Sequence, residues 1–122
     1  MESNKKLLIL VDDNPANLRI GKNVLSEKYT VATAPSAAKL FSLLENNNPA
    51  LILLDIDMPG MNGYEAIEVL KLKPETKDIP VIFLTGMTGS QDEEKGRALG
   101  AVDCITKPFN PPALIDCIEK HS

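Results

Sequence analysis

The stretch LILLDIDMPGMNG, residues 51–63, decides the fold of this chain. Residues 51–54 are all apolar and show none of the alternation expected of a strand with one wet face. Such a run is typical of a strand buried on both faces, as in a parallel sheet covered by helices. Asp55 ends the run, and Asn62 stands three positions before Glu65, which is the spacing of a helix capping box. The stretch therefore predicts a buried strand, a polar turn and the start of a helix.

The same pattern recurs along the rest of the chain. Apolar runs at residues 7–11, 79–84 and 101–105, and a weaker β-branched segment at 29–33, predict four more strands. Helix start signals follow at Asn14 with Pro15, Ser36, Ser90 and Asn110 with Pro111, and Gly100 is expected to end the fourth helix. The order is β-α repeated five times, which predicts an α/β fold with a sheet sandwiched between helices.

In the first helix, the apolar residues predict which side is buried. We expect Ile20, Gly21, Val24 and Leu25 to face the core. Arg19, Lys22 and Asn23 are expected to face water.

Length and charge limit the classes of protein. With 122 residues, of which 43% are hydrophobic, we expect a single domain spanning residues 1–122. The 13 basic and 17 acidic residues give a net charge of -4, so neither nucleic acid nor a membrane is an expected partner. The apolar part of the N-terminus is too short for a signal peptide or a membrane span, so a cytoplasmic location is expected.

Two cysteines, Cys104 and Cys117, show no metal-type spacing. In a reducing compartment they would stay as thiols. We expect both to be small buried hydrophobic residues.

Polar residues follow the predicted strands at the point where each strand ends. They are Asp12 with Asp13, Asp55, Thr85 and Lys107. In open parallel sheets, ligands bind outside the carboxyl ends of the strands. We therefore expect these residues to form one site.

The chemistry of these residues points to a metal and a phosphoryl group. Asp12, Asp13, Asp55 and Asp57 would place several negative charges together, which requires a cation. The ligands are all oxygen, without His or Cys, which favours Mg²⁺ or Mn²⁺ over Zn²⁺.

A carboxylate can act as a nucleophile toward phosphorus and form an acyl phosphate, and Asp55 is the candidate for this role. Lys107 would supply a compact positive charge. The Thr85 hydroxyl would bond a phosphoryl oxygen.

Four motifs carry a resemblance: LVDDN at 10–14, DIDMPGMNG at 55–63, FLTG at 83–86 and ITKPF at 105–109. Together they strongly resemble the receiver domain of two-component response regulators, over essentially the whole chain. The resemblance implies a flavodoxin-like (βα)5 three-layer sandwich whose parallel sheet has strand order 2-1-3-4-5. It also implies a switch that catalyses its own phosphorylation and slow hydrolysis and is not a turnover enzyme.

The resemblance assigns a role to each site residue. It makes Asp55 the phosphoacceptor, because Pro59 follows at the family's spacing. It makes Asp13 a direct metal ligand, Asp12 a ligand through water, and the backbone carbonyl of Asp57 a third metal contact. Lys107 matches the phosphate-binding lysine, Thr85 the switch hydroxyl, and Gly86 the small residue that leaves room for the phosphoryl group.

The resemblance also implies partners. A histidine kinase or a histidine phosphotransfer domain would be the phosphodonor. The fourth helix, fifth strand and fifth helix would form the output face, acting on an output domain in the same chain, on a separate protein or on a second copy in a homodimer. Residues 12–18 and 100–103 resemble receivers placed before cyclic-di-nucleotide signalling domains or at the end of hybrid kinases.

Two positions depart from the family pattern. Cys104 stands where the family usually has Tyr or Phe, and a thiol cannot fill or vacate that space as the ring does when it couples to Thr85. Asp57 can hamper a water that attacks the acyl phosphate, which predicts a slower loss of the phosphoryl group.

The sequence is also compatible with two other functions. A pseudo-receiver would keep the fold as an interaction module and ignore phosphate. A haloacid-dehalogenase-type phosphatase would use Asp55 as nucleophile and Asp57 as general acid, although that family places its motif after the first strand and needs a larger body.

Overall fold

A computed structural model describes residues 5–86, 90–106 and 110–121, with only the backbone described for residues 90–93. Five parallel strands form one sheet in the order β2-β1-β3-β4-β5. The strands are β1 (Leu7–Val11), β2 (Thr30–Ala34), β3 (Leu51–Asp55), β4 (Val81–Thr85) and β5 (Asp103–Thr106). The helices are α1 (Pro15–Leu25), α2 (Ala37–Leu44), α3 (Gly63–Leu72), α4 (Ser90–Leu99) and α5 (Pro111–His121). The predicted α/β sandwich and its strand order are confirmed.

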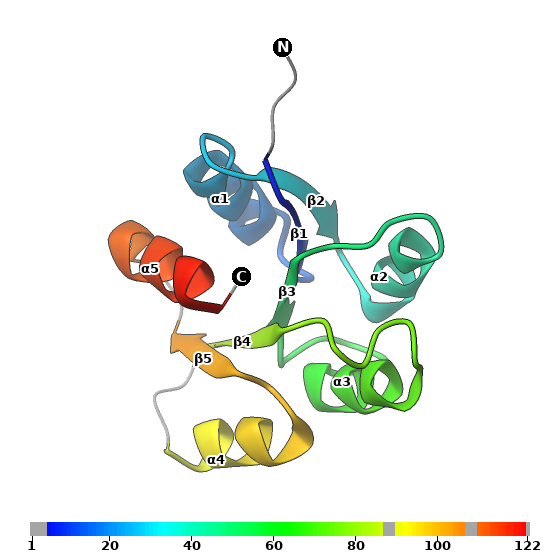
Figure 1. Ribbon diagram of the computed structural model, residues 1–122. Helices are drawn as coiled ribbons and strands as arrows, with labels where there is room; N and C mark the ends of the chain where they lie inside the picture. The colour runs from blue at the N-terminus through cyan, green and yellow to red at the C-terminus, as the bar shows by residue number, and fades with distance from the viewer. Residues whose placement is uncertain (1–4, 87–89, 107–109, 122) are drawn as a thin grey trace.

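The helices cover both faces of the sheet, with α1 and α5 on one face and α2, α3 and α4 on the other (Figure 1). Successive strand residues point to opposite faces. In β3, Leu51 and Leu53 join the core beneath α1 and α5, whereas Ile52 and Leu54 join the core beneath the other three helices. A strand between two cores needs apolar residues at every position, which explains the unbroken run in the sequence.

The predicted helix starts agree with the structure. The side chains of Asn14, Ser36 and Asn110 accept hydrogen bonds from amides of the turns that they begin. Asn62 and Glu65 form the reciprocal capping box, with both hydrogen bonds at 2.9 Å. Helix α4 begins at Ser90, whose side chain lies outside the described part of the chain.

Gly100 ends α4 as expected. Its φ of 113° lies in the region that L side chains rarely adopt, and its N–H donates to the Arg97 carbonyl at 3.0 Å.

The predicted orientation of Ile20 is wrong, because 52% of this residue is exposed. Gly21 and Leu25 are buried, and Leu18 and Val24 are partly buried against the core. At about 100° per residue, Ile20 projects well away from the direction shared by Gly21 and Leu25. Ile20 is therefore an apolar residue that lies next to the buried side of α1, not on it.

Three strands begin later than predicted. β2 and β4 begin at Thr30 and Val81, and β5 begins at Asp103. Ala101 lies just beyond α4 and is held to it, because its N–H donates to the Gly96 carbonyl at 3.0 Å. Among the described residues, no helix combines the length and the apolar character needed to cross a lipid bilayer.

The prediction that both cysteines are buried is also wrong, because Cys104 and Cys117 are only partly buried. Cys104 lies on β5, an edge strand with a neighbour on one side only. Cys117 lies on α5 and contacts the outer part of the core beneath that helix. An edge strand and the helix above it leave more solvent access than the centre of the sheet.

Candidate functional site

Three carboxylates converge at the carboxyl ends of β1 and β3. Each of Asp12, Asp13 and Asp55 offers an oxygen, and these oxygens all lie within 4.8 Å of one another. Val11 pairs with Leu54 in the sheet, so the residues that follow them meet at the same edge. Asp12 and Asp55 are buried, at 0% and 1% exposure, whereas Asp13 is exposed to solvent. The site therefore consists of two buried carboxylates and one carboxylate at the protein surface.

The Asp12 carboxylate is held in place by two hydrogen bonds. Its Oδ1 accepts from the backbone N–H of Asn14 at 2.9 Å, and its Oδ2 accepts from the Asn17 side-chain amide at 3.2 Å. Sequence reasoning missed the role of Asn17. The signal was an amide in the first turn of α1, five residues after an acidic residue at a strand end.

A second missed residue is Gly63, where α3 begins beside the end of β3. A Cβ at this position would lie 2.5 Å from the Asp55 carbonyl oxygen and 2.8 Å from the Ile56 Cα. The Gly63 N–H donates to the Ile56 carbonyl at 2.9 Å. Glycine therefore permits a close approach that fixes the backbone of Asp55 against the start of α3.

Thr85 and Gly86 lie at the end of the next strand, β4. Leu84 pairs with Asp55, so Thr85 lies one position beyond it along the neighbouring strand. Thr85 is buried, with 4% exposure. Among the described residues, a Cβ built on Gly86 would meet no atom within 4 Å, so these residues leave open space at this strand end.

Lys107 and Asp57 are the remaining residues that the sequence assigned to this site. Lys107 lies outside the described residues; β5 ends just before it, at Thr106, which pairs with Thr85. The Asp57 side chain is exposed and does not belong to the group of converging carboxylates. The sequence therefore correctly predicted the convergence of Asp12, Asp13 and Asp55 and the position of Thr85 beside it.

The donor set suits a hard divalent cation. Three carboxylates this close repel one another, and the burial of two of them raises the cost of their charges. A bound divalent cation would offset both the repulsion between the carboxylates and the free-energy cost of burying their charges. The ligands are oxygens, which favours Mg²⁺ or Mn²⁺ over a softer metal. The residues present therefore fit the metal that the sequence predicted.

A family model described as the response regulator receiver domain matches residues 8–119. A probable cyclic di-GMP phosphodiesterase of Vibrio cholerae serotype O1 is 40% identical over 114 residues, which cover 93% of this chain and 26% of that protein. The polar-differentiation response regulator DivK of Brucella ovis is 31% identical over 117 residues, which cover 95% of each. The chain thus spans about a quarter of one relative and nearly all of another.

Solved structures agree with this match. The Vibrio cholerae chemotaxis protein CheY4 is 25% identical and superposes with a TM-score of 0.91, covering 97% of this chain and 99% of that chain. The agreement covers the whole sandwich.

Proposed function

This chain belongs to the response regulator receiver domain family, and we propose that it is a phosphoacceptor signalling domain that takes a phosphoryl group from phosphohistidine onto Asp55. The observation that supports this proposal is the burial of the Asp55 carboxylate within 4.8 Å of two further carboxylate oxygens. A buried acidic group at a strand end suits a nucleophile whose charge is balanced by a bound cation.

In the proposed reaction, an Asp55 carboxylate oxygen attacks phosphorus. The new P–O bond forms as the P–N bond to the donor imidazole breaks, and the imidazole leaves with a proton from solvent. The product is an acyl phosphate, which water later hydrolyses. The domain thus catalyses its own phosphorylation and its slow loss of phosphate, and is not a turnover enzyme.

The other site residues position and stabilise the phosphoryl group. Asp12, Asp13 and Asp55, with the Asp57 backbone carbonyl, would hold Mg²⁺ or Mn²⁺. When bound, the metal would neutralise the charge of the phosphoryl oxygens. The Thr85 hydroxyl would donate to one of these oxygens, and Lys107 would pair with another. Gly86 leaves open space where the group would be accommodated.

We propose a histidine kinase or a histidine phosphotransfer domain as the phosphodonor. The output face would comprise α4, β5 and α5, acting on a domain in the same chain, on a separate partner or on a second copy. A cyclic di-GMP phosphodiesterase among the relatives agrees with an appended output domain, whereas DivK agrees with a free-standing receiver. The net charge of -4 disfavours direct contact with nucleic acid or an anionic membrane.

Labelling with acetyl phosphate and Mg²⁺, read on a phosphate-affinity gel, tests the acceptor. We expect the wild type to be labelled and Asp55→Asn to lose the label, because the amide cannot form the acyl phosphate. Asp57→Asn is the matched control, since it changes an exposed carboxylate two residues away and keeps the backbone carbonyl.

Three outcomes would contradict the proposal. Label that persists in Asp55→Asn would place the acceptor elsewhere. A wild type that binds a partner but takes no label would indicate a pseudo-receiver instead. Turnover of a phosphomonoester that required Asp55 would favour the phosphatase reading, against which the family match weighs.

The same gel measures the lifetime of the phosphorylated state. We expect labelled Asp57→Asn to lose its phosphate faster than the wild type, because the Asp57 carboxylate no longer hampers the attacking water. Equal decay rates under Mg²⁺ would contradict the role given to Asp57.

A further inference from the structure

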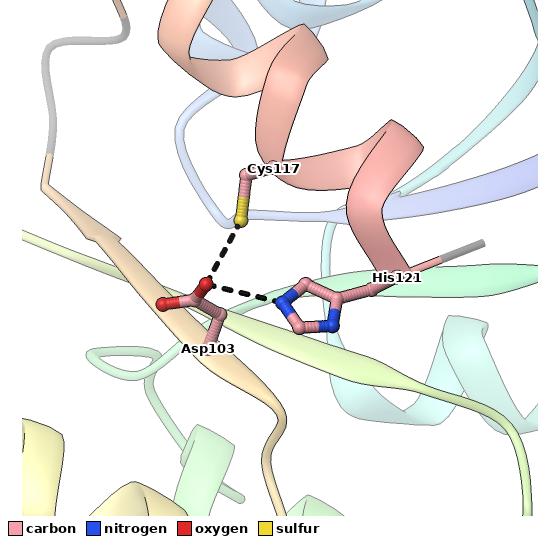
Figure 2. Close-up of side chains that lie close together, drawn as sticks. All are labelled: Asp103, Cys117 and His121. Carbon is pink, nitrogen blue, oxygen red and sulfur yellow. Dashed lines mark hydrogen bonds and ion pairs between the residues drawn. The ribbon is translucent and has the colours of Figure 1, made fainter.

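A second group of metal-type ligands lies between β5 and α5 (Figure 2). It consists of Asp103 on β5 and of Cys117 and His121 on α5, each offering one ligand atom, all within 4.8 Å of one another. Asp103 pairs with Ile82 near the start of β4, whereas Asp55 pairs with Leu84 toward its end. We propose that this group is a zinc site, separate from the phosphoacceptor site and independent of its function.

The distances within the group suit a small coordination shell. Asp103 Oδ2 lies 3.3 Å from Cys117 Sγ and 3.1 Å from His121 Nε2. Zinc bond lengths of about 2.0–2.3 Å place neighbouring tetrahedral ligands roughly 3.3–3.6 Å apart. Cys117 and His121 are four residues apart, which places them on the same side of α5. Small side-chain adjustments would therefore let one ion contact all three.

The Asp103 carboxylate is oriented by contacts through its other oxygen. Oδ1 accepts from the Cys104 N–H at 2.9 Å and forms an ion pair with Arg97 Nη2 at 3.5 Å. Oδ2 is thereby turned toward α5. Contacts that orient a metal ligand through its other oxygen are characteristic of metal sites and strengthen metal binding.

The ligand chemistry separates this site from the acidic one. A thiolate, an imidazole and a carboxylate suit Zn²⁺, whereas the all-oxygen site suits Mg²⁺. Three protein ligands leave a fourth position for water. The side chains of Asp103 and His121 are 24% and 21% exposed, so an ion can reach the group from solvent.

Without metal, the Cys117 thiol keeps its proton. Burial, together with the hydrogen bond and the negative charge of Asp103, raises the pKa of Cys117 to about 12. This argues against a role as a free nucleophile, because the thiolate is the reactive form. On binding zinc, the S–H bond breaks, an S–Zn bond forms and the proton goes to solvent.

Cobalt titration of the untagged chain tests the site, with Mg²⁺ in excess to occupy the acidic site. A Cys thiolate bound to Co²⁺ gives a near-ultraviolet charge-transfer band that oxygen ligands do not give. We expect a band that saturates at one Co²⁺ per chain and disappears when Zn²⁺ is added. Cys104→Ser should keep the band, because the Cys104 side chain lies outside the group.

Ligand variants complete the test. Cys117→Ser should abolish the band, and Asp103→Asn and His121→Gln should weaken cobalt binding by at least about tenfold. Thermal melts of each metal-free variant test whether the fold is retained, and His121→Gln keeps a hydrogen-bonding group in case Asp103→Asn does not fold. Absence of the band in the wild type, its persistence in Cys117→Ser or its loss in Cys104→Ser would overturn the proposal.

Discussion

Asn17 contacts the acidic site through Asp12, since its side-chain amide donates to Asp12 Oδ2 at 3.2 Å. Replacement by alanine would remove this hydrogen bond and would weaken the orientation of a proposed metal ligand. We expect Asn17→Ala to weaken Mg²⁺ binding by about tenfold, the range typical of residues that support metal ligands. The Mg²⁺ concentration that gives half-maximal labelling by acetyl phosphate measures this change.

Asn23→Ala is the matched control, because Asn23 is exposed on the same helix. It should leave the Mg²⁺ dependence unchanged. Equal half-saturation for wild type and Asn17→Ala would show that the Asn17 bond is not needed to orient Asp12.

Gly63 is a second residue whose effect is local and measurable. In Gly63→Ala, the added methyl would meet the Asp55 carbonyl oxygen at 2.5 Å, so the start of α3 must move away from β3. Overpacking of this kind costs about 1–3 kcal/mol, which denaturant unfolding followed by circular dichroism can measure. Gly86→Ala, where a Cβ meets no atom of the described part of the chain within 4 Å, should lose less stability. Equal losses at the two positions would contradict the steric explanation.

At the scale of elements, Lys71 ties the end of α3 to the loop before β4. Its Nζ donates to the Lys77 carbonyl at 3.0 Å and to the Ile79 carbonyl at 3.5 Å. Burial lowers the pKa of Lys71 below its ordinary value of 10.5, despite the opposing charge of Asp78. The loop therefore depends on an ammonium group that is partly removed from water.

This lowered pKa predicts a pH dependence with a definite sign. Between the folded-state pKa and 10.5, the unfolded chain binds more protons than the folded chain, so the unfolding free energy rises with pH. Lys71→Arg stays charged throughout and should lack this rise. Urea unfolding of both proteins across this alkaline range measures the difference. A wild-type curve parallel to that of Lys71→Arg would contradict the prediction.

Sequence signals within one turn of the chain predicted the helix starts correctly. The predictions that failed concern features set by packing between parts of the chain that are distant in sequence. The caps at Asn14, Ser36 and Asn62 depend on residues within one turn, so the sequence contains the whole signal. The exposure of Ile20 depends on how α1 is rotated against the sheet. That rotation is set by packing, which neighbouring residues do not reveal.

The candidate site divides in the same way. Asp12, Asp13 and Asp55 could be placed together because the carboxyl ends of adjacent parallel strands meet at one edge. The contacts of Asn17 and Gly63 depend on how the loops after β1 and β3 lead into the next helices, which the strand pattern does not specify. The group at Asp103, Cys117 and His121 was missed for a related reason: its ligands lie on different elements, and only two share a helical spacing.

At the scale of the whole molecule, the proposed output face carries charges of both signs. On α4 and α5, the exposed residues include Glu94, Lys95, Arg97 and Lys120. A twofold interface brings the same surface of two copies together, so a surface with both signs can complement itself. This supports a second copy as one partner of the phosphorylated domain.

We therefore expect phosphorylation by acetyl phosphate to raise the dimer fraction in sedimentation velocity. Lys120→Glu should weaken the dimer by at least about tenfold, because it places like charges across the interface. Lys22→Glu on α1 makes the same charge change on an exposed residue outside this face and should leave the dimer intact. High salt should weaken the wild-type dimer, since exposed charges are screened. Two results would contradict this prediction: labelled and unlabelled wild type sediment alike as monomers, or Lys22→Glu and Lys120→Glu have the same effect. In either case the face formed by α4, β5 and α5 does not join two copies, and its partner is another protein or domain.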